Sequence, residues 1–267
     1  MHSPTVLHLA PHPDDEVLGA GATLMALRDA GSRVVNLACS LGRSEERERR
    51  EQEVREASAR TGFELVIHDP PLAISAEDDL DAAQATLART LGETIAAIGA
   101  EIVVSPSPHD GHHGHEVVGR AARDALRALR DSAPRWWMWG LWAELPFPTL
   151  VSLFGADRLD ALVYALEAHA GEIARNDFAD LARSRATVAR VIGAEKAFGY
   201  GAEGFDRPHA DLLTEAIAAG GRWTAAAPRV LDPVDPLAGG EPAQPLDWWL
   251  DAESYADRMR RESAAQG

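Results

Sequence analysis

The sequence predicts an α/β fold: a Rossmann-like, open and mostly parallel sheet flanked by helices, followed by a C-terminal helical and loop extension. Short apolar runs alternate with amphipathic helical segments through about residue 142, an order typical of parallel sheets. Two of these runs end directly in clusters of histidine and carboxylate residues. Because ligands bind beyond the carboxyl ends of strands in such sheets, these two positions predict the functional site.

The chain length of 267 residues predicts one large domain, with a core over residues 1–200. After Gly199 the sequence becomes rich in glycine, proline and alanine. We therefore expect residues 201–267 to form an extension that packs on the same domain as loops and ends in a helix over residues 251–261.

The first cluster follows an apolar run at residues 6–10, which predicts a buried strand, and precedes residues 17–30, which predict a helix. His12 and Asp15 lie three residues apart on the intervening turn, so both can reach one metal ion while Asp14 faces a metal-bound water. Nitrogen and oxygen ligands of this kind suit Zn²⁺. Taken alone, the motif is equally typical of a solvated loop whose carboxylates favour the N-terminus of a helix.

The second cluster makes the metal interpretation stronger. It follows an apolar run at residues 102–104 and precedes a predicted helix over residues 116–130, and four of the ten histidines fall within residues 109–115. A catalytic zinc site has three protein ligands and one open position. His12, Asp15 and one of these four histidines supply that set.

The residues of both clusters resemble the motifs of a known family. Residues 12–16 resemble the His-Pro-Asp-Asp-Glu signature of the LmbE-like or PIG-L superfamily of zinc-dependent N-deacetylases. Residues 110–115 resemble the second family motif at both of its outer histidines. The resemblance covers roughly residues 5–200 and implies a metal-dependent hydrolase with one Zn²⁺ per chain.

The resemblance also implies a role for each site residue. His12, Asp15 and His115 are the implied metal ligands, Asp14 is the implied general base, and His112 stabilises the oxyanion. The chain departs from the family pattern at His113, which replaces proline, and at Gly114, which replaces aspartate. We expect His109, His113 or Asp110 to compensate for that missing carboxylate.

Further residues are candidates for the substrate pocket. Arg50 lies where family members place an arginine that faces the substrate, and Arg43 is its rival because it lies nearer the strand end. Asp110 and Trp142 complete the predicted substrate contacts. His169 resembles a downstream family position and lies either at the pocket or on a helix surface.

The stretch over residues 136–155 is long and apolar enough to resemble a membrane span. Glu144, Pro146 and Pro148 interrupt it, so we expect no transmembrane segment but a buried strand followed by a loop. Trp139, Trp142 and Phe147 are candidates for the wall of the substrate pocket or of a subunit interface, and we expect most of these aromatic residues in the core or at an interface. An interface between copies of the chain makes the protein a homo-oligomer.

Composition restricts the partners and the compartment. The net charge of −16 argues against nucleic acid, because phosphate binding requires a basic surface. A single cysteine, Cys39, and the lack of a positively charged, apolar leader indicate a reduced, cytoplasmic setting.

These observations predict an N-deacetylase that acts on an N-acetylated aminosugar, such as a GlcNAc-containing glycoside or a natural-product conjugate, and releases acetate and a free amine. One alternative is a thiol-conjugate amidase with the same metal chemistry. Another is a metal-binding protein that has lost turnover, for which Gly114 is the only indication and against which the intact Asp14 argues.

Overall fold

The centre of the sheet consists of parallel strands whose spatial order differs from their order in the chain. The computed structural model describes residues 3–264, so the first two residues of the predicted core and the last three of the predicted extension lie outside it. The parallel strands lie side by side as β3 (Glu64–Ile67), β2 (Arg33–Ala38), β1 (Thr5–Ala10), β4 (Ile102–Pro106) and β5 (Arg135–Trp139). This order and direction confirm the predicted Rossmann-like class.

The connections that follow β1 and β4 leave the sheet in opposite directions. From β1 the chain continues to β2 and β3 on one side, and from β4 it continues to β5 on the other. The two strands pair directly, with Val6 opposite Ile102 and His8 opposite Val104. A crevice therefore opens at their carboxyl ends, where the strand order reverses, and both histidine-containing motifs begin there.

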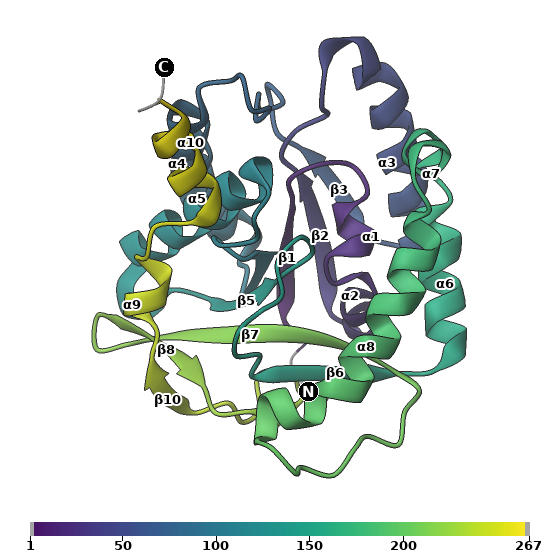
Figure 1. Ribbon diagram of the computed structural model, residues 1–267, viewed down its shortest axis with the longest axis vertical. Helices are drawn as coiled ribbons and strands as arrows, with labels where there is room; N and C mark the ends of the chain where they lie inside the picture. Colours follow the sequence, from purple (N-terminus) through teal and green to yellow (C-terminus); the bar gives the residue numbers. More distant parts are fainter. Residues whose placement is uncertain (1–2, 265–267) are drawn as a thin grey trace.

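Helices cover both faces of the sheet (Figure 1). One face carries α4 (Leu80–Ile98) and α5 (His113–Leu129), and the other carries α2 (Gly21–Asp29), α3 (Arg47–Thr61), α6 (Ala156–Leu166) and α8 (Phe178–Phe198). Side chains alternate between the faces: Leu7 and Leu9 pack toward α4 and α5, whereas Val6 packs toward α2 and α6. Two apolar cores thus hold the central strands from both sides.

Local signals fix the ends of the longer helices. Asp79 caps α4, because its carboxylate accepts the backbone N–H of Ala82 at 3.0 Å. Gly62 ends α3 with φ of 71° and Gly99 ends α4 with φ of 64°, values that a residue with a side chain rarely adopts. Short 3₁₀ turns, η1 (Ser44–Glu46) and η2 (Arg130–Ser132), complete this half of the chain.

The C-terminal segment differs from the prediction of loops and a helix. It contains β7 (His209–Ala219), β8 (Arg222–Ala226), β9 (Arg229–Val230) and β10 (Pro242–Pro245), of which β7 pairs antiparallel with β5 and with β6 (Leu150–Phe154). The alanine-rich sequence of β7 has low intrinsic strand propensity, so pairing with its neighbours decides its conformation. The short helix α9 (Asp247–Leu250) and the helix α10 (Tyr255–Ala264) follow, so the final helix lies further along the chain than predicted.

The helix predicted over residues 17–30 is broken into two, α1 (Asp15–Leu18) and α2. Gly19 lies between them, so close to Trp139 that a Cβ there would lie 2.5 Å from the indole. Residues 157–175 form α6 and α7 (Ala170–Arg175). The apolar stretch over residues 136–155 forms β5, a loop and β6, and no helix within residues 3–264 is long and apolar enough to cross a membrane.

Helix α5 lies directly against the loop that carries the second motif. A Cβ at Gly119 would lie 2.7 Å from the backbone nitrogen of Pro108 and 2.8 Å from the carbonyl oxygen of Pro106. These neighbours are backbone atoms, so they cannot make room by a change of side-chain rotamer. Gly119 therefore sets the distance between α5 and the loop.

We expect Gly119→Ala to lower the free energy of unfolding by about 1–3 kcal/mol, because the added methyl overpacks this contact. Gly92→Ala, in α4, is the matched control: no heavy atom lies within 4 Å of its new Cβ, so it should raise that free energy by up to about 1 kcal/mol. Denaturant unfolding of both variants tests this. Equal changes in the free energy of unfolding for the two variants would contradict the close contact between Gly119 and the loop.

Candidate active site

The first motif forms a strained turn at the end of β1. The carboxylate of Asp15 accepts the backbone N–H of His12 at 2.9 Å. Asp14, between them, has φ of 111° and ψ of −27°, a conformation that is rare for a residue with a side chain. Such strain persists only where the surroundings impose it and is typical of functional sites.

Glu16 and His169 stabilise this turn through hydrogen bonds. Glu16 accepts the backbone N–H of Asp14 at 3.0 Å through Oε2, and its Oε1 lies 2.6 Å from Nε2 of His169. Both side chains are completely buried. His169 therefore lies neither in the pocket nor on a helix surface, the two positions expected from sequence. It supports the backbone of Asp14 through Glu16.

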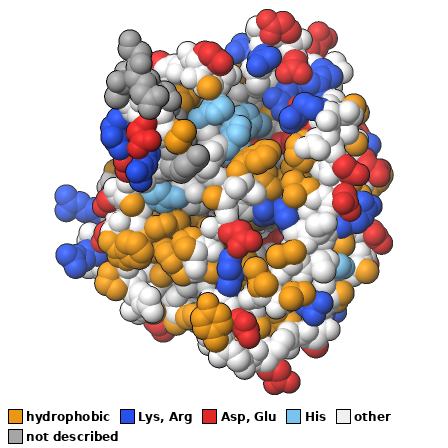
Figure 2. Space-filling view, viewed as in Figure 1, with side chains coloured by type: hydrophobic (Ala, Val, Ile, Leu, Met, Phe, Trp, Pro, Cys, Tyr) orange, Lys and Arg blue, Asp and Glu red, His pale blue; other side chains and the backbone are white. Residues whose placement is uncertain are grey.

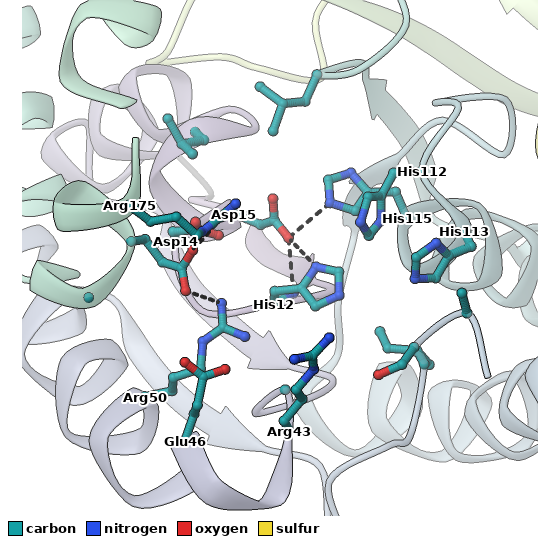
Figure 3. A pocket seen from close by; sticks show the side chains of 18 of the residues that line it. His12, Asp14, Asp15, Arg43, Glu46, Arg50, His112, His113, His115 and Arg175 are labelled. Atoms are coloured by element: carbon teal, nitrogen blue, oxygen red, sulfur yellow. Dashed lines mark hydrogen bonds and ion pairs between the residues drawn. The ribbon is translucent and has the colours of Figure 1, made fainter. Parts of the chain in front are cut away.

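Asp15 connects the two motifs. Its Oδ2 lies 3.3 Å from Nδ1 of His12 and 3.3 Å from Nε2 of His115, and the side chains of Asp15 and His115 are each only 2% exposed. Figure 3 shows both imidazoles turned toward this carboxylate. The crevice between β1 and β4 thus brings together two clusters that are about a hundred residues apart in the sequence.

Asp110 fixes the opposite edge of the His115 ring. Its Oδ2 lies 2.7 Å from Nδ1 of His115, while its Oδ1 accepts the backbone N–H groups of Leu141, Trp142 and Ala143 at 2.6, 3.2 and 3.3 Å. A histidine whose second nitrogen is bound by a carboxylate is the usual form of a histidine metal ligand. Asp110 is completely buried and does not line the pocket, so its position differs from the substrate contact we expected.

The donor set fits a divalent metal ion. Ring nitrogens of His12, His112 and His115 lie within 4.8 Å of one another, and Asp15 contacts two of these residues. Three imidazoles and a carboxylate exceed the three protein ligands that a catalytic zinc site needs, so one group of the four is free for another role.

The electrostatics of His115 favour a cation at this point. Burial alone would lower its pKa, but Asp15 and Asp110 raise the pKa of His115 to about 10. The two carboxylates therefore hold a proton on the ring when no metal is bound. A metal ion that binds the ring nitrogen displaces this proton, and the positive charge of the ion then takes the place of the proton's charge.

The environment shifts the pKa values of the two adjacent aspartates, Asp14 and Asp15, in opposite directions. Burial, together with the charges of Asp15 and Glu16, raises the pKa of Asp14 well above its ordinary value. Burial acts in the same direction on Asp15, but His115 and His12 outweigh it and hold the pKa of Asp15 well below its usual range. Asp15 is therefore the charged partner of the histidines, and Asp14 is the group whose affinity for a proton is increased.

His112 is neutral in this environment. Burial, followed by the charges of His115, His12 and His113, lowers its pKa to about 3. Its Nδ1 is buried without a hydrogen-bond partner within residues 3–264. His112 is thus an uncharged imidazole that can donate or accept one hydrogen bond toward a ligand.

A pocket of about 740 Å³ opens onto these groups. In Figure 2, histidine side chains gather in a hollow on this face of the molecule. The lining includes all five residues predicted as catalytic groups or metal ligands, which are His12, Asp14, Asp15, His112 and His115. It also includes two of the predicted substrate contacts, Arg50 and Trp142. The sequence prediction had not identified Glu172 and Arg175, which also line it; no motif marks them, and they reach the pocket from α7.

The two predicted substrate contacts in the lining differ in exposure. Arg50 is largely buried and forms an ion pair with Glu172 at 3.0 Å. The Trp142 ring is 53% exposed and stacks against His112 with ring centroids 5.8 Å apart. Arg43 also lines the pocket. Trp139 is instead buried in the core, and Phe147 packs on Trp249, so neither of these two aromatic residues lines the pocket.

A known protein family matches the part of the chain that contains both motifs. Residues 7–126, which contain both motifs, match the family model PIG-L, described as GlcNAc-PI de-N-acetylase. The match spans less than half of the chain and supports its assignment to the PIG-L superfamily. The resemblance inferred from the two motifs is therefore confirmed. No curated protein sequence matches the chain.

Solved structures share the PIG-L fold with this chain. The A40926 pseudoaglycone deacetylase Dbv21 is 17% identical, with a TM-score of 0.62 over 79% of this chain and 96% of its own. The zinc-inhibited form of teicoplanin deacetylase Orf2 is 13% identical, with a TM-score of 0.62 over 81% and 99%. GalB, the 4-carboxy-2-hydroxymuconate hydratase from Pseudomonas putida KT2440, is 17% identical, with a TM-score of 0.58 over 79% and 95%. Because these include a hydratase, the fold alone does not select the reaction.

Gly114, where the PIG-L motif has aspartate, lies against a predicted metal ligand. A Cβ at this position would lie 2.8 Å from Cε1 and 2.9 Å from Nε2 of His12, and 3.3 Å from Ile74. The His12 ring occupies the space that a side chain would need. The absence of a side chain at Gly114 therefore allows the His12 ring to occupy this position.

We expect Asp110→Asn to lower the affinity for Zn²⁺ by about 10–100-fold, because the second nitrogen of His115 loses its carboxylate partner. Competition with a chromophoric chelator measures this affinity. Asp206→Asn, on the exposed surface outside the pocket, is the control and should leave it unchanged. Unchanged affinity in folded Asp110→Asn protein would contradict the positioning role.

We expect Gly114→Ala to weaken Zn²⁺ binding about tenfold or more, because the new methyl displaces the His12 ring. Gly92→Ala is the matched control and should bind Zn²⁺ normally. If Gly114→Ala binds Zn²⁺ as tightly as the unmodified chain, His12 is not a ligand in the position described.

Proposed function

We propose that this chain is a metal-dependent N-deacetylase that removes the acetyl group from an N-acetylated aminosugar, such as a GlcNAc-containing glycoside or a natural-product conjugate. The observation that carries this proposal is the position of Asp14. Its buried carboxylate, with a raised pKa, lines the same pocket as the cluster of His12, Asp15, His112 and His115. The PIG-L match over both motifs supports the same chemistry.

The proposed metal is one Zn²⁺ per chain, with His12, Asp15 and His115 as ligands. Asp15 and Asp110 concentrate negative charge around His115, which favours a cation there. When bound, the ion supplies a Lewis acid that polarises a carbonyl group and makes water easier to deprotonate. This assignment leaves His112 as the fourth donor, free to act on the substrate.

Asp14 and His112 carry out the proton transfers and the charge stabilisation. Asp14 accepts a proton from the water that attacks the acetamide carbon, and the new carbon–oxygen bond produces a tetrahedral oxyanion. His112, as a neutral imidazole, donates a hydrogen bond to that oxyanion. Asp14 then returns its proton to the nitrogen as the carbon–nitrogen bond breaks, which releases acetate and the free amine.

The pocket favours a substrate larger than a simple acetamide. Its volume of about 740 Å³ lies within the range of sites that enclose whole ligands. Trp142 offers an exposed aromatic face beside His112, and Arg50 lies on the wall formed by α3. Two similar deacetylases are named for A40926 pseudoaglycone and for teicoplanin, and a bulky or hydrophobic aglycone fits the exposed aromatic face of Trp142.

We expect Asp14→Asn to keep the fold and the bound metal but to lose about 10²–10⁴-fold in turnover, because the amide cannot accept the proton. His12→Ala should instead lose the metal, and Asp206→Asn should retain both properties. The assay is amine release from a panel of N-acetyl glycosides and thiol conjugates, with acetate measured in parallel.

The outcomes separate the competing functions. Near-normal turnover in metal-loaded Asp14→Asn would reject the role of Asp14. Cleavage of thiol conjugates alone would identify the amidase, and metal binding without any release across the panel would favour the protein that has lost turnover.

A further inference from the structure

A second pocket adjoins the active site at Leu18 and has no part in the proposed reaction. It measures about 270 Å³ and shares only Leu18 with the lining of the first pocket. Its walls come from α1, α6, α8 and the strands β6 and β7. Most of the lining is apolar and includes Val17, Leu145, Phe154, Leu159, Leu162 and Ile192.

One guanidinium group reaches this apolar space without an acidic partner. Arg185, from α8, donates through Nη1 to the carbonyl oxygen of Leu141 at 3.1 Å and through Nη2 to that of Gly140. Within the described residues 3–264 no carboxylate forms an ion pair with it. Burial lowers the pKa of Arg185, the direction expected when a cation leaves water. Arg185 is only partly exposed, and an anion that enters the pocket stabilises such a cation.

Asp211, one of the two carboxylates that line the pocket, is engaged elsewhere. Oδ2 of Asp211 accepts the backbone N–H of Thr23 at 3.1 Å and its hydroxyl at 2.7 Å. Burial raises the pKa of Asp211, so its negative charge is disfavoured in this environment. Two of the five N–H donors of Arg185 are used by the carbonyls of residues 140 and 141, which leaves three for a ligand.

The lining also contains an exposed ion pair that costs little to break. Nζ of Lys196 lies 2.5 Å from Oε2 of Glu144, whose side chain is 70% exposed. Exposed ion pairs contribute about 0–1 kcal/mol, so this one does not exclude a ligand. Hydrophobic side chains gather on the same face, around α8 (Figure 2).

We propose that this second pocket binds a small monocarboxylate with an apolar chain or ring, its carboxylate paired with Arg185 and its apolar part against α6 and α8. The volume is smaller than that of sites for drug-sized molecules, which start at about 300 Å³. A guanidinium group and a carboxylate form short, charge-assisted hydrogen bonds, and these fix the orientation of the ligand. The apolar wall excludes small hydrophilic anions.

Calorimetric titration with three ligands of equal length tests the charge requirement. Octanoate should bind at least about tenfold more tightly than 1-octanol or octylammonium, because only the carboxylate pairs with Arg185. Equal binding of all three, or no octanoate binding at millimolar concentration, would overturn the proposal. The titration uses the chain without added metal or substrate, so its failure is distinguishable from failure of the proposed deacetylase activity.

Two variants on α8 test the location. Ala189→Leu places its side chain in the second pocket and should abolish octanoate binding, whereas Val191→Leu, at a position that is 57% exposed and outside the lining, should leave it unchanged. Octanoate binding that survives Ala189→Leu would place the ligand elsewhere. Arg185→Gln should remove the preference for octanoate over octanol; if this variant does not fold, Ala189→Leu still decides the outcome.

Discussion

The parallel pairing of β1 with β4 is the constraint on which the site depends. These two strands are adjacent in the sheet, but their connections leave in opposite directions. Their carboxyl ends therefore stay uncovered, and each end carries one of the two histidine motifs. Every contact between the motifs, including the 3.3 Å contact of Asp15 with His115, depends on this neighbour relation.

The charged groups around them give two adjacent residues opposite chemical properties. Asp14 and Asp15 follow one another in the chain, yet only Asp15 faces the imidazoles that favour its charged form. Asp14 lies beside Asp15 and Glu16 and is pushed toward its protonated form. Pairs of titratable groups whose pKa values are separated in this way are suited to distinct roles, one as a ligand or charge partner and the other as a proton carrier.

Support for the site extends beyond the segment that matches PIG-L, which ends at residue 126. The loop over residues 140–143 is bound on one side by Asp110, through backbone N–H groups, and on the other by Arg185, through carbonyl oxygens. His169 supports Asp14 through Glu16 in the same manner. Residues of α8 and of the turn before α7 therefore act on the site, and Arg185 connects the second pocket to the loop that carries Trp142.

The sequence alone determined the fold class and the positions of the two motifs, because strand-helix alternation and strand-end histidine clusters are local patterns. It also indicated the family, which the PIG-L match confirms. The tertiary structure decided that residues 209–245 include strands, since pairing with β5 and β6 outweighs the weak strand propensity of an alanine-rich segment. It also decided that Asp110 supports His115 from outside the pocket and that Gly114 makes room for His12. Such contacts join residues through space, and no spacing along one chain specifies which nitrogen a carboxylate reaches or which ring fills the space beside a glycine.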